Sequence, residues 1–149
     1  MKKLQTILAA AILLVATSAF AAKGPEKVNA AVKQAFEKQF ITASNVSWEK
    51  AEGFYFATFR LNDKDVSVAY NENGEMVGAS RTVSTEELPM SVSMTLAEKY
   101  KGYSISKTAN EVVYDGTSSY YITAENEKQT LKLKCLSSGD ISIVSKTKK

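Results

Sequence analysis

The feature that most constrains the fold of this chain is a hairpin pattern that occurs twice, sixty-five positions apart. The stretches YNENGEMVGAS at 70–80 and CLSSGDISIVS at 135–145 share one order: an alternating apolar run, a glycine, an acidic residue and a second alternating run. Alternation of apolar and polar residues is typical of half-buried β-strands, so each stretch predicts a hairpin. A pattern that recurs in the same order indicates an internal repeat.

The two halves stay in register at this offset along four predicted strands. Trp48 corresponds to Val113, Tyr55 to Tyr120, Phe56 to Tyr121, Thr58 to Thr123, Val66 to Leu131, Val68 to Leu133, Gly74 to Gly139 and Met76 to Ile141. The alternative is that two amphipathic meanders have merely slid into partial register. The common order of helix, four strands and hairpin glycine favours the repeat.

A predicted helix precedes the strands of each half. In the first half, Val28, Ala31, Val32, Ala35, Phe36 and Phe40 fall at the spacing of one buried helical face. Val92, Leu96 and Tyr100 repeat the last part of this pattern at an offset of sixty, and Pro89 suits the first helical turn. The helices of the two halves correspond at an offset of sixty, but the strands correspond at sixty-five. This difference implies about five extra residues in the second half, around KGYSISKTAN.

After each helix the apolar period changes to two. We expect strands at 45–49, 54–61, 65–70 and 76–82 in the first half, and at 111–114, 119–125, 130–136 and 141–145 in the second. The dipeptide Asn73-Gly74 predicts a type I′ turn, whose two central residues need a positive φ. Asp115-Gly116 and Ser138-Gly139 mark two turns of the second half.

These patterns predict an α+β fold made of two tandem α-β-β-β-β repeats. Because a helix and a four-stranded meander each have one face to bury, the two units should form an antiparallel sheet with both helices on one face. The expected boundaries are a signal peptide at 1–21, the first repeat at 22–82, a linker at 83–88 and the second repeat at 89–149.

The first residues have the pattern of a secretory signal peptide. Lys2 and Lys3 precede the short apolar run ILAAAILLVA, and Ala19-Phe20-Ala21 supplies small residues for cleavage. The alternative, a transmembrane anchor, would need a longer apolar run. No cysteine follows the predicted cleavage site, so the sequence predicts a periplasmic or secreted protein without a membrane anchor.

Residue counts narrow the function further. The chain has no histidine and a single cysteine, Cys135, which excludes Ser-His-Asp and Cys-His catalysis, imidazole zinc sites and an internal disulfide. The net charge is +3, and two of these charges lie in the predicted leader at Lys2 and Lys3. Neither nucleic acid nor an acidic membrane is therefore an expected partner. We expect no enzyme activity and no cofactor.

The sequence resembles an exported PepSY-like family described as β-lactamase-inhibitor-like proteins. The likeness rests on Trp48 after NV, the NENGEM hairpin, ELP at 87–89 and AEKYKGYSI at 97–105, and it covers nearly the whole mature chain. It implies tandem α+β units with helices on one face of a curved antiparallel sheet. It also implies relatives that are peptidase-associated modules or inhibitors of other proteins, and it supplies no catalytic residue.

Two polar features have a functional and a structural interpretation. Asn62, Asp63 and Asp65, with Asn71, Glu72, Asn73 and Glu75, gather oxygen atoms in two turns, as a calcium site would. Their spacing differs from an EF-hand, and these are also ordinary turn residues, so we assign no metal site. Cys135 falls on the inward side of its strand, where a lone thiol is usually a small buried hydrophobe rather than a reactive group.

The alternation also predicts a binding surface. If the helices cover the side of Val66 and Leu131, the other side carries aromatic and basic residues, which is the composition of a protein-binding surface. The predicted partner-binding residues are Phe54, Phe56, Arg60, Tyr121, Lys132 and Lys134, with Arg81 nearby. The alternative is ordinary cross-strand packing on a half-exposed sheet.

These observations favour an exported, non-enzymatic module that binds a protein partner of the cell envelope or the exterior. It would inhibit or regulate an envelope or secreted enzyme. The alternative function is a periplasmic small-ligand or calcium-binding protein, which would show a concave pocket or a cation-dependent melting temperature.

Overall fold

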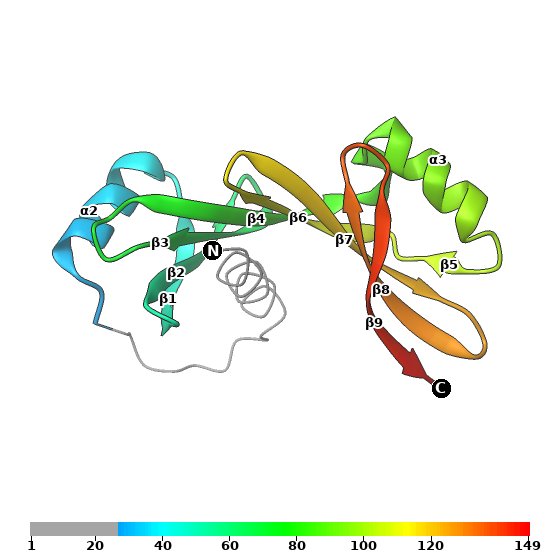
Figure 1. The fold of residues 1–149 in the computed structure, drawn as a ribbon. Helices are drawn as coiled ribbons and strands as arrows, with labels where there is room; N and C mark the ends of the chain where they lie inside the picture. Colours follow the sequence, from blue (N-terminus) through cyan, green and yellow to red (C-terminus); the bar gives the residue numbers. More distant parts are fainter. Residues whose placement is uncertain (1–26) are drawn as a thin grey trace. The chain divides into compact units, whose positions relative to one another are not determined.

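The computed structural model of the chain describes residues 27–149 (Figure 1). The predicted signal peptide, 1–21, lies outside these residues. The elements along the chain are α2 (Ala30–Gln39), β1 (Ser44–Ala51), β2 (Phe54–Leu61), β3 (Lys64–Tyr70), β4 (Met76–Ser84), the 3₁₀ turn η1 (Thr85–Glu87), α3 (Met90–Lys99), β5 (Ser104–Ile105), β6 (Thr108–Tyr114), β7 (Thr117–Glu125), β8 (Gln129–Leu136) and β9 (Ile141–Lys148). The predicted α+β class is confirmed.

The strands form an open antiparallel sheet in the order β1-β2-β3-β4-β6-β7-β8-β9, and β5 pairs with β7. Contacts between residues divide the chain into two compact units. Among the described residues, the first consists of 27–81 together with Val113–Asp115, and the second of Thr82–Val112 and Gly116–Lys149. Each unit has its own helix; that both helices lie on one face of the sheet stays a prediction.

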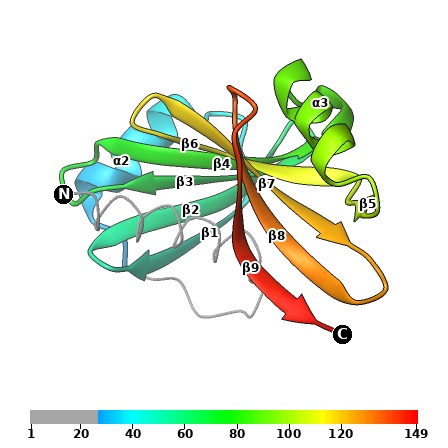
Figure 2. The same cartoon turned by 45° about the vertical axis from the view of Figure 1, so that its right-hand side comes forward.

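In the first unit, α2 packs its apolar stripe against β1, β2 and β3 (Figure 2). The helix begins after Asn29, whose side chain accepts a hydrogen bond from the Val32 N–H at 2.9 Å, an N-cap that satisfies one free backbone donor. Phe36 is the centre of the cluster, because its ring lies 5.1 Å from both Trp48 and Phe59 in edge-to-face contacts. The buried residues of this cluster are Val32, Phe36, Tyr55, Ala57, Phe59, Val68 and Tyr70.

The second unit repeats this packing with smaller side chains. Val92 and Leu96 are the buried residues of α3, as Val32 and Phe36 are of α2. Pro89 lies immediately before the helix as its N-cap residue, one position earlier than the predicted first turn. The buried cluster contains Val83, Leu88, Val92, Leu96, Ala109, Ile122, Ala124, Leu131, Leu133 and Cys135.

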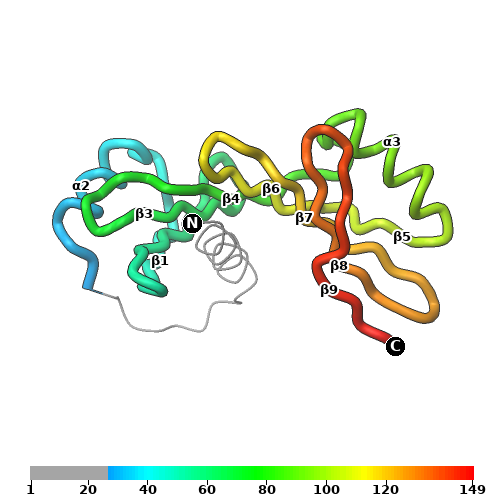
Figure 3. The backbone as a smooth tube through the Cα atoms, viewed as in Figure 1, coloured from blue at the N-terminus to red at the C-terminus, as the bar shows by residue number. Residues whose placement is uncertain are grey.

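The doubled hairpin of the sequence is present in the backbone hydrogen bonds. The Asn71 N–H donates to the Glu75 carbonyl and the Gly74 N–H to the Asn71 carbonyl; sixty-five positions later, Leu136, Gly139 and Asp140 make the same two bonds. Figure 3 follows the chain through the second of these hairpins, between β8 and β9.

The predicted type I′ turn at Asn73-Gly74 is wrong. Gly74 has a positive φ of 83°, but Asn73 does not belong to the described residues with positive φ. The turn contains a bond from Gly74 to Asn71 and one left-handed glycine, which is the geometry of a longer hairpin loop with a bulge. Two positive φ values in succession occur instead at Glu52-Gly53, Asn62-Asp63 and Asp115-Gly116.

The second half departs from the predicted strand pattern at both ends, since its last strand, β9, continues to Lys148 beyond the predicted end at 145. Its first long strand, β6, begins at Thr108 rather than at the predicted position 111, and a short additional strand, β5, precedes it. This addition falls within KGYSISKTAN, the segment in which the sequence places about five extra residues.

Candidate functional site

The six predicted partner-binding residues fall into two groups, one in each unit. Phe54, Phe56 and Arg60 lie on β2 of the first unit, whereas Tyr121 lies on β7 and Lys132 and Lys134 on β8 of the second unit. In both groups they alternate with residues of the clusters that α2 and α3 cover, so each group lies on the side of its strands opposite its own helix.

In the first unit, the prediction that Phe56 is exposed is wrong. Only 1% of Phe56 is exposed, and Phe54 is half-buried. The alternation correctly separated Phe56 from Tyr55 and Ala57, but it does not tell which side of a sheet excludes water. A buried phenylalanine supports the fold and cannot contact a partner directly.

Arg60 is exposed, as expected, but its guanidinium is engaged by its own hairpin. Its Nη2 donates to the Asp63 carbonyl at 3.0 Å, and its Nε lies 3.8 Å from a carboxylate oxygen of Asp65 across the β2–β3 pair. Such an exposed ion pair contributes little to stability.

In the second unit, the three predicted residues do lie together. The register pairs Tyr121 with Lys134 and Thr123 with Lys132, and directly paired side chains project to the same side of an antiparallel sheet. Lys132 and Lys134 form no ion pair with any residue of 27–149. Tyr121 is half-buried, and burial raises its pKa, so the phenol stays neutral and can donate a hydrogen bond.

Strand β9 extends this surface with hydroxyl groups. Lys132 pairs with Ser145 and Lys134 with Ser142, while Lys146 pairs with the core residue Leu131 and belongs to the other side. We call the set formed by Tyr121, Thr123, Lys132, Lys134, Ser142 and Ser145 the β7–β9 face. It offers two ammonium groups that have no ion-pair partner in the described part of the chain, one half-buried aromatic ring and several hydroxyl groups.

An ion pair closes one end of the β7–β9 face. Lys149 Nζ lies 2.8 Å from a carboxylate oxygen of Glu125, and this hydrogen bond and charge hold the pKa of Glu125 below its ordinary value. Because Glu125 is already paired, the free charge of the face is positive.

The remaining candidates are Cys135 and the acidic turns. Cys135 is a buried free thiol, as predicted, and burial raises its pKa to about 11. In the acidic turn, the Asn71 side-chain oxygen accepts hydrogen bonds from the Asn73 and Glu75 N–H groups, as in an Asx turn. Residues 27–149 contain no group of three or more His, Cys, Asp or Glu arranged to hold a metal ion.

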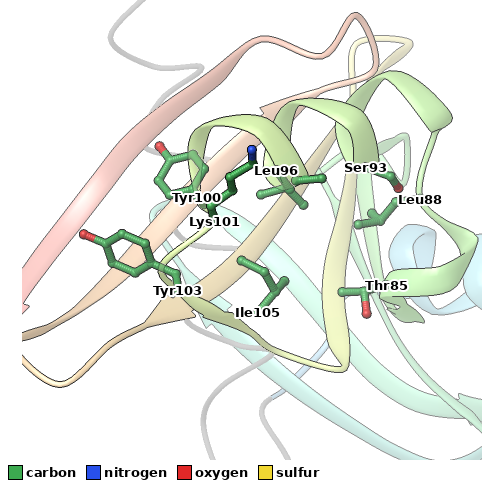
Figure 4. A pocket seen from close by; sticks show the side chains of 9 residues that line it. Thr85, Leu88, Ser93, Leu96, Tyr100, Lys101, Tyr103 and Ile105 are labelled. Carbon is green, nitrogen blue, oxygen red and sulfur yellow. The ribbon is translucent and has the colours of Figure 1, made fainter.

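One surface was not predicted from the sequence: a groove beside α3 that we call the α3–β5 groove. It is lined by Thr85, Leu88, Ser93, Leu96, Ala97, Tyr100, Lys101, Tyr103 and Ile105 (Figure 4). The signal for it was present in the sequence as the extra residues around KGYSISKTAN, which supply Lys101, Tyr103 and Ile105. No helix within 27–149 combines the length and the apolar character that crossing a bilayer requires.

Several crystal structures share this fold. A protein from Bacteroides eggerthii described as periplasmic aligns with a TM-score of 0.70 and 17% identity, over 83% of this chain and 90% of its own. A DUF2874 family protein from Bacteroides uniformis aligns with a TM-score of 0.69 and 20% identity, over 82% and 90%. A BLIP-like protein from Bacteroides fragilis aligns with a TM-score of 0.64 and 17% identity, over 86% and 89%.

No family model matches the sequence, and no curated protein matches it either. At 17% to 20% identity, the likeness to the crystal structures shows the fold alone. The predicted resemblance to β-lactamase-inhibitor-like proteins is thus confirmed at the level of fold.

Proposed function

We propose that the protein is an exported, non-enzymatic module that binds a protein partner through the β7–β9 face. The observation that carries this proposal is the pair Lys132 and Lys134, which form no ion pair within 27–149 and lie near the half-buried Tyr121 on the side of the sheet opposite the α3 cluster. Lysines without a partner ion favour an acidic surface opposite them, and Tyr121, which pairs directly with Lys134, can act as the anchor of an interface.

The similar crystal structures support the proposal of an exported, protein-binding module. One of the proteins with this fold is described as periplasmic and another as BLIP-like, which is consistent with export and with binding another protein. More specifically, we propose that the partner is an envelope or secreted enzyme that this protein inhibits or regulates. Phe54 and Arg60 of the first unit form a second predicted contact patch, whereas Phe56 supports the sheet beneath it.

Charge reversal on the two sides of the sheet tests this function. The purified protein is used as bait in an envelope extract, and the captured partner is then titrated against variants. Lys132→Glu with Lys134→Glu should weaken binding at least tenfold, and raised salt should weaken the original binding as well, because exposed charges are screened. Lys146→Glu is the matched control, since Lys146 pairs with Leu131 on the opposite side.

Tyr121→Ala should cost about 1–4 kcal/mol of binding free energy if the ring is an interface anchor, with little loss of folding stability. Partner binding that survives both the double charge reversal and Tyr121→Ala, while Lys146→Glu abolishes it, would place the interface elsewhere. Turnover of a peptide, ester or sugar by the purified protein, lost on changing one carboxylate or serine, would contradict the non-enzymatic assignment.

A further inference from the structure

The α3–β5 groove lies within the second unit, between the helix and the short strand that follows it. It has a volume of about 420 Å³ and is open to solvent. Figure 4 shows Leu96 of α3 and Tyr100, the residue that ends the helix, facing Ile105 of β5 and Tyr103 just before it, with Leu88 and Thr85 toward the other end. Leu88 and Leu96 are buried and provide an apolar base, while the rim carries hydroxyl groups and one ammonium group.

The first repeat shows that this groove is a departure from the common pattern. At the offset of sixty, Ser93 and Ala97 of α3 correspond to Lys33 and Glu37 of α2. All four are exposed, so the exchange of charged for small residues is not needed to build the core. Small residues on a helix let another chain approach its surface closely. The equivalent positions of α2 carry the long charged side chains of Lys33 and Glu37 instead.

The second departure builds the opposite wall. The extra residues around KGYSISKTAN form β5 and place Tyr103 and Ile105 across from α3. Two independent differences between the repeats, one on the helix and one in the inserted segment, therefore line the same groove. A structural insertion alone would not require the helix surface to change with it.

Strand β5 leaves one of its edges without a strand partner among residues 27–149. It pairs with β7 only, and the Ser106 N–H donates to the Thr123 carbonyl at 2.9 Å on that side. Because the backbone groups of successive residues point to opposite edges, the N–H and carbonyl of Ile105 point away from β7. An edge of this kind can pair with an added strand.

One end of the groove carries a free positive charge. Lys101 follows α3, lines the groove and forms no ion pair with a described residue. The neighbouring rings of Tyr100 and Tyr103 contact each other edge to face at 5.7 Å, and the Tyr103 hydroxyl accepts a hydrogen bond from Gln129 Nε2. These contacts fix the end wall beside the ammonium group.

We propose that the α3–β5 groove binds an extended segment of a partner protein that adds as an antiparallel strand to β5, inserts an apolar side chain between Leu96 and Ile105, and places a carboxylate near Lys101. The unpaired edge supplies backbone hydrogen bonds, and the apolar base supplies side-chain specificity. Lys101 lies toward the start of β5, so a carboxylate at the C-terminal end of the segment requires the antiparallel direction.

A synthetic peptide tests the proposal on the purified full-length mature protein. The probe is the acetylated heptapeptide Thr-Val-Thr-Leu-Thr-Val-Asp, whose apolar side chains share one side when it is extended. Binding is followed by nuclear magnetic resonance, and the expected result is shifted amide signals at Ile105, Tyr103 and Leu96. N-methylation of the central leucine should weaken binding at least tenfold, because it removes a backbone donor.

Variants of α3 identify the groove as the site. Ala97→Glu introduces the residue that α2 carries at Glu37, and it should fold normally but weaken peptide binding at least tenfold. Met94→Gln is the matched control, since Met94 is exposed on the same helix but does not line the groove, and Gln34 is its counterpart in α2. Lys101→Gln should weaken the acidic probe severalfold and leave a probe with an amidated, asparagine-ended C-terminus unchanged.

This proposal concerns a different surface from the β7–β9 face and is tested separately from the proposed function. Lys132→Glu with Lys134→Glu should bind the heptapeptide normally. No binding at millimolar peptide, equal binding by Ala97→Glu, or amide shifts confined to the β7–β9 face would overturn it. Binding of an amphipathic helix or an alkyl carboxylate, with no binding of the extended peptide, would overturn it as well.

Discussion

Gly74 lies against the carbonyl group of Ala31, so that the turn of the β3–β4 hairpin rests on the first turn of α2. A Cβ atom placed on Gly74 would lie 2.7 Å from the Ala31 oxygen. In the second unit, a Cβ atom on Gly139 would lie 3.0 Å from the Ser91 oxygen. The recurrence of this contact explains why the sequence contains the hairpin pattern twice: each hairpin must approach its own helix more closely than a side chain permits.

Substitution of Gly74 by alanine should therefore destabilise the protein by more than its backbone conformation alone explains. Gly53 is the matched control, because its φ of 80° is close to the 83° of Gly74 but a Cβ atom there would meet nothing within 4 Å. Gly53→Ala should cost about 1–2 kcal/mol from the left-handed conformation. Gly74→Ala should cost about 1–3 kcal/mol more from overpacking. Equal losses in urea unfolding would contradict the close approach.

The start of α2 depends on a side chain that has no counterpart in α3. Asn29 caps the helix and also donates from its Nδ2 to the Glu72 carbonyl at 2.9 Å, whereas α3 has no side-chain cap. In the second unit, the Ser91 hydroxyl donates to the Ser137 carbonyl. This hydrogen bond connects the helix to the β8–β9 hairpin, as Asn29 Nδ2 connects α2 to its hairpin, but it does not cap the helix.

Asn29→Ala should thus lower the free energy of unfolding by about 1–2 kcal/mol, the usual loss of an N-cap. Ser91→Ala should cost about 0.5–1.5 kcal/mol, since it removes one exposed hydrogen bond. Urea unfolding of both variants measures the difference. A Ser91→Ala variant that loses as much as Asn29→Ala would indicate that the cap contributes little.

The sequence predicted the repeat because its signals are local. Alternation, helical spacing and the glycines at Gly74 and Gly139 depend on neighbours in the chain, and they gave the elements with boundaries close to the observed ones. The short strand β5 was missed because two residues, Ser104 and Ile105, are too few to show a period. Its position was marked only by the shift in offset between the two halves.

Only part of the candidate site was predicted, because alternation tells which side chains share a side of a strand but not which side is exposed. Alternation places Tyr121, Lys132 and Lys134 on one side of their strands, and the register confirms that they are neighbours. Alternation does not tell how much of a side is covered, and Phe56 is therefore buried where exposure was expected. The α3–β5 groove depends on how three consecutive segments, η1, α3 and β5, fold against one another, and Leu96 and Ile105 line it from two of them. Periodicity within one segment does not predict such an arrangement.

The ion pair at the end of the β7–β9 face should affect the titration of Glu125. Lys149→Gln removes the hydrogen bond and the charge that lower the Glu125 pKa, so this pKa should rise toward its ordinary value. A folded-state pKa below the unfolded one stabilises the protein above the unfolded pKa, and this stability is lost as the pH falls through the folded pKa. Titration of the Glu125 carboxyl signal by nuclear magnetic resonance measures the shift. Lys146→Gln, on the other side of the sheet, should leave it unchanged.

Cys135 should react slowly with thiol reagents and should make the protein less stable at high pH. Burial in the α3 cluster raises its pKa from 9.0 to about 11, so the folded protein holds the thiol proton at a pH at which the unfolded chain has lost it. Below pH 9 this contribution to stability is fully present, and it is lost as the pH rises toward 11.

The stability of Cys135→Ser separates this titration from the rest of the pH dependence. The variant should lose about 1–3 kcal/mol near neutral pH, because a buried hydroxyl gains no ready partner among the surrounding apolar side chains. Its further loss between pH 9 and 11 should be smaller than that of the original protein, since serine does not titrate there. A native thiol that is modified as fast as the unfolded one would show that the strand does not bury Cys135. In that case, the assignment of Cys135 to the inward side of β8 would have to be revised. The assignment of Lys132 and Lys134 to the outward side would have to be revised with it.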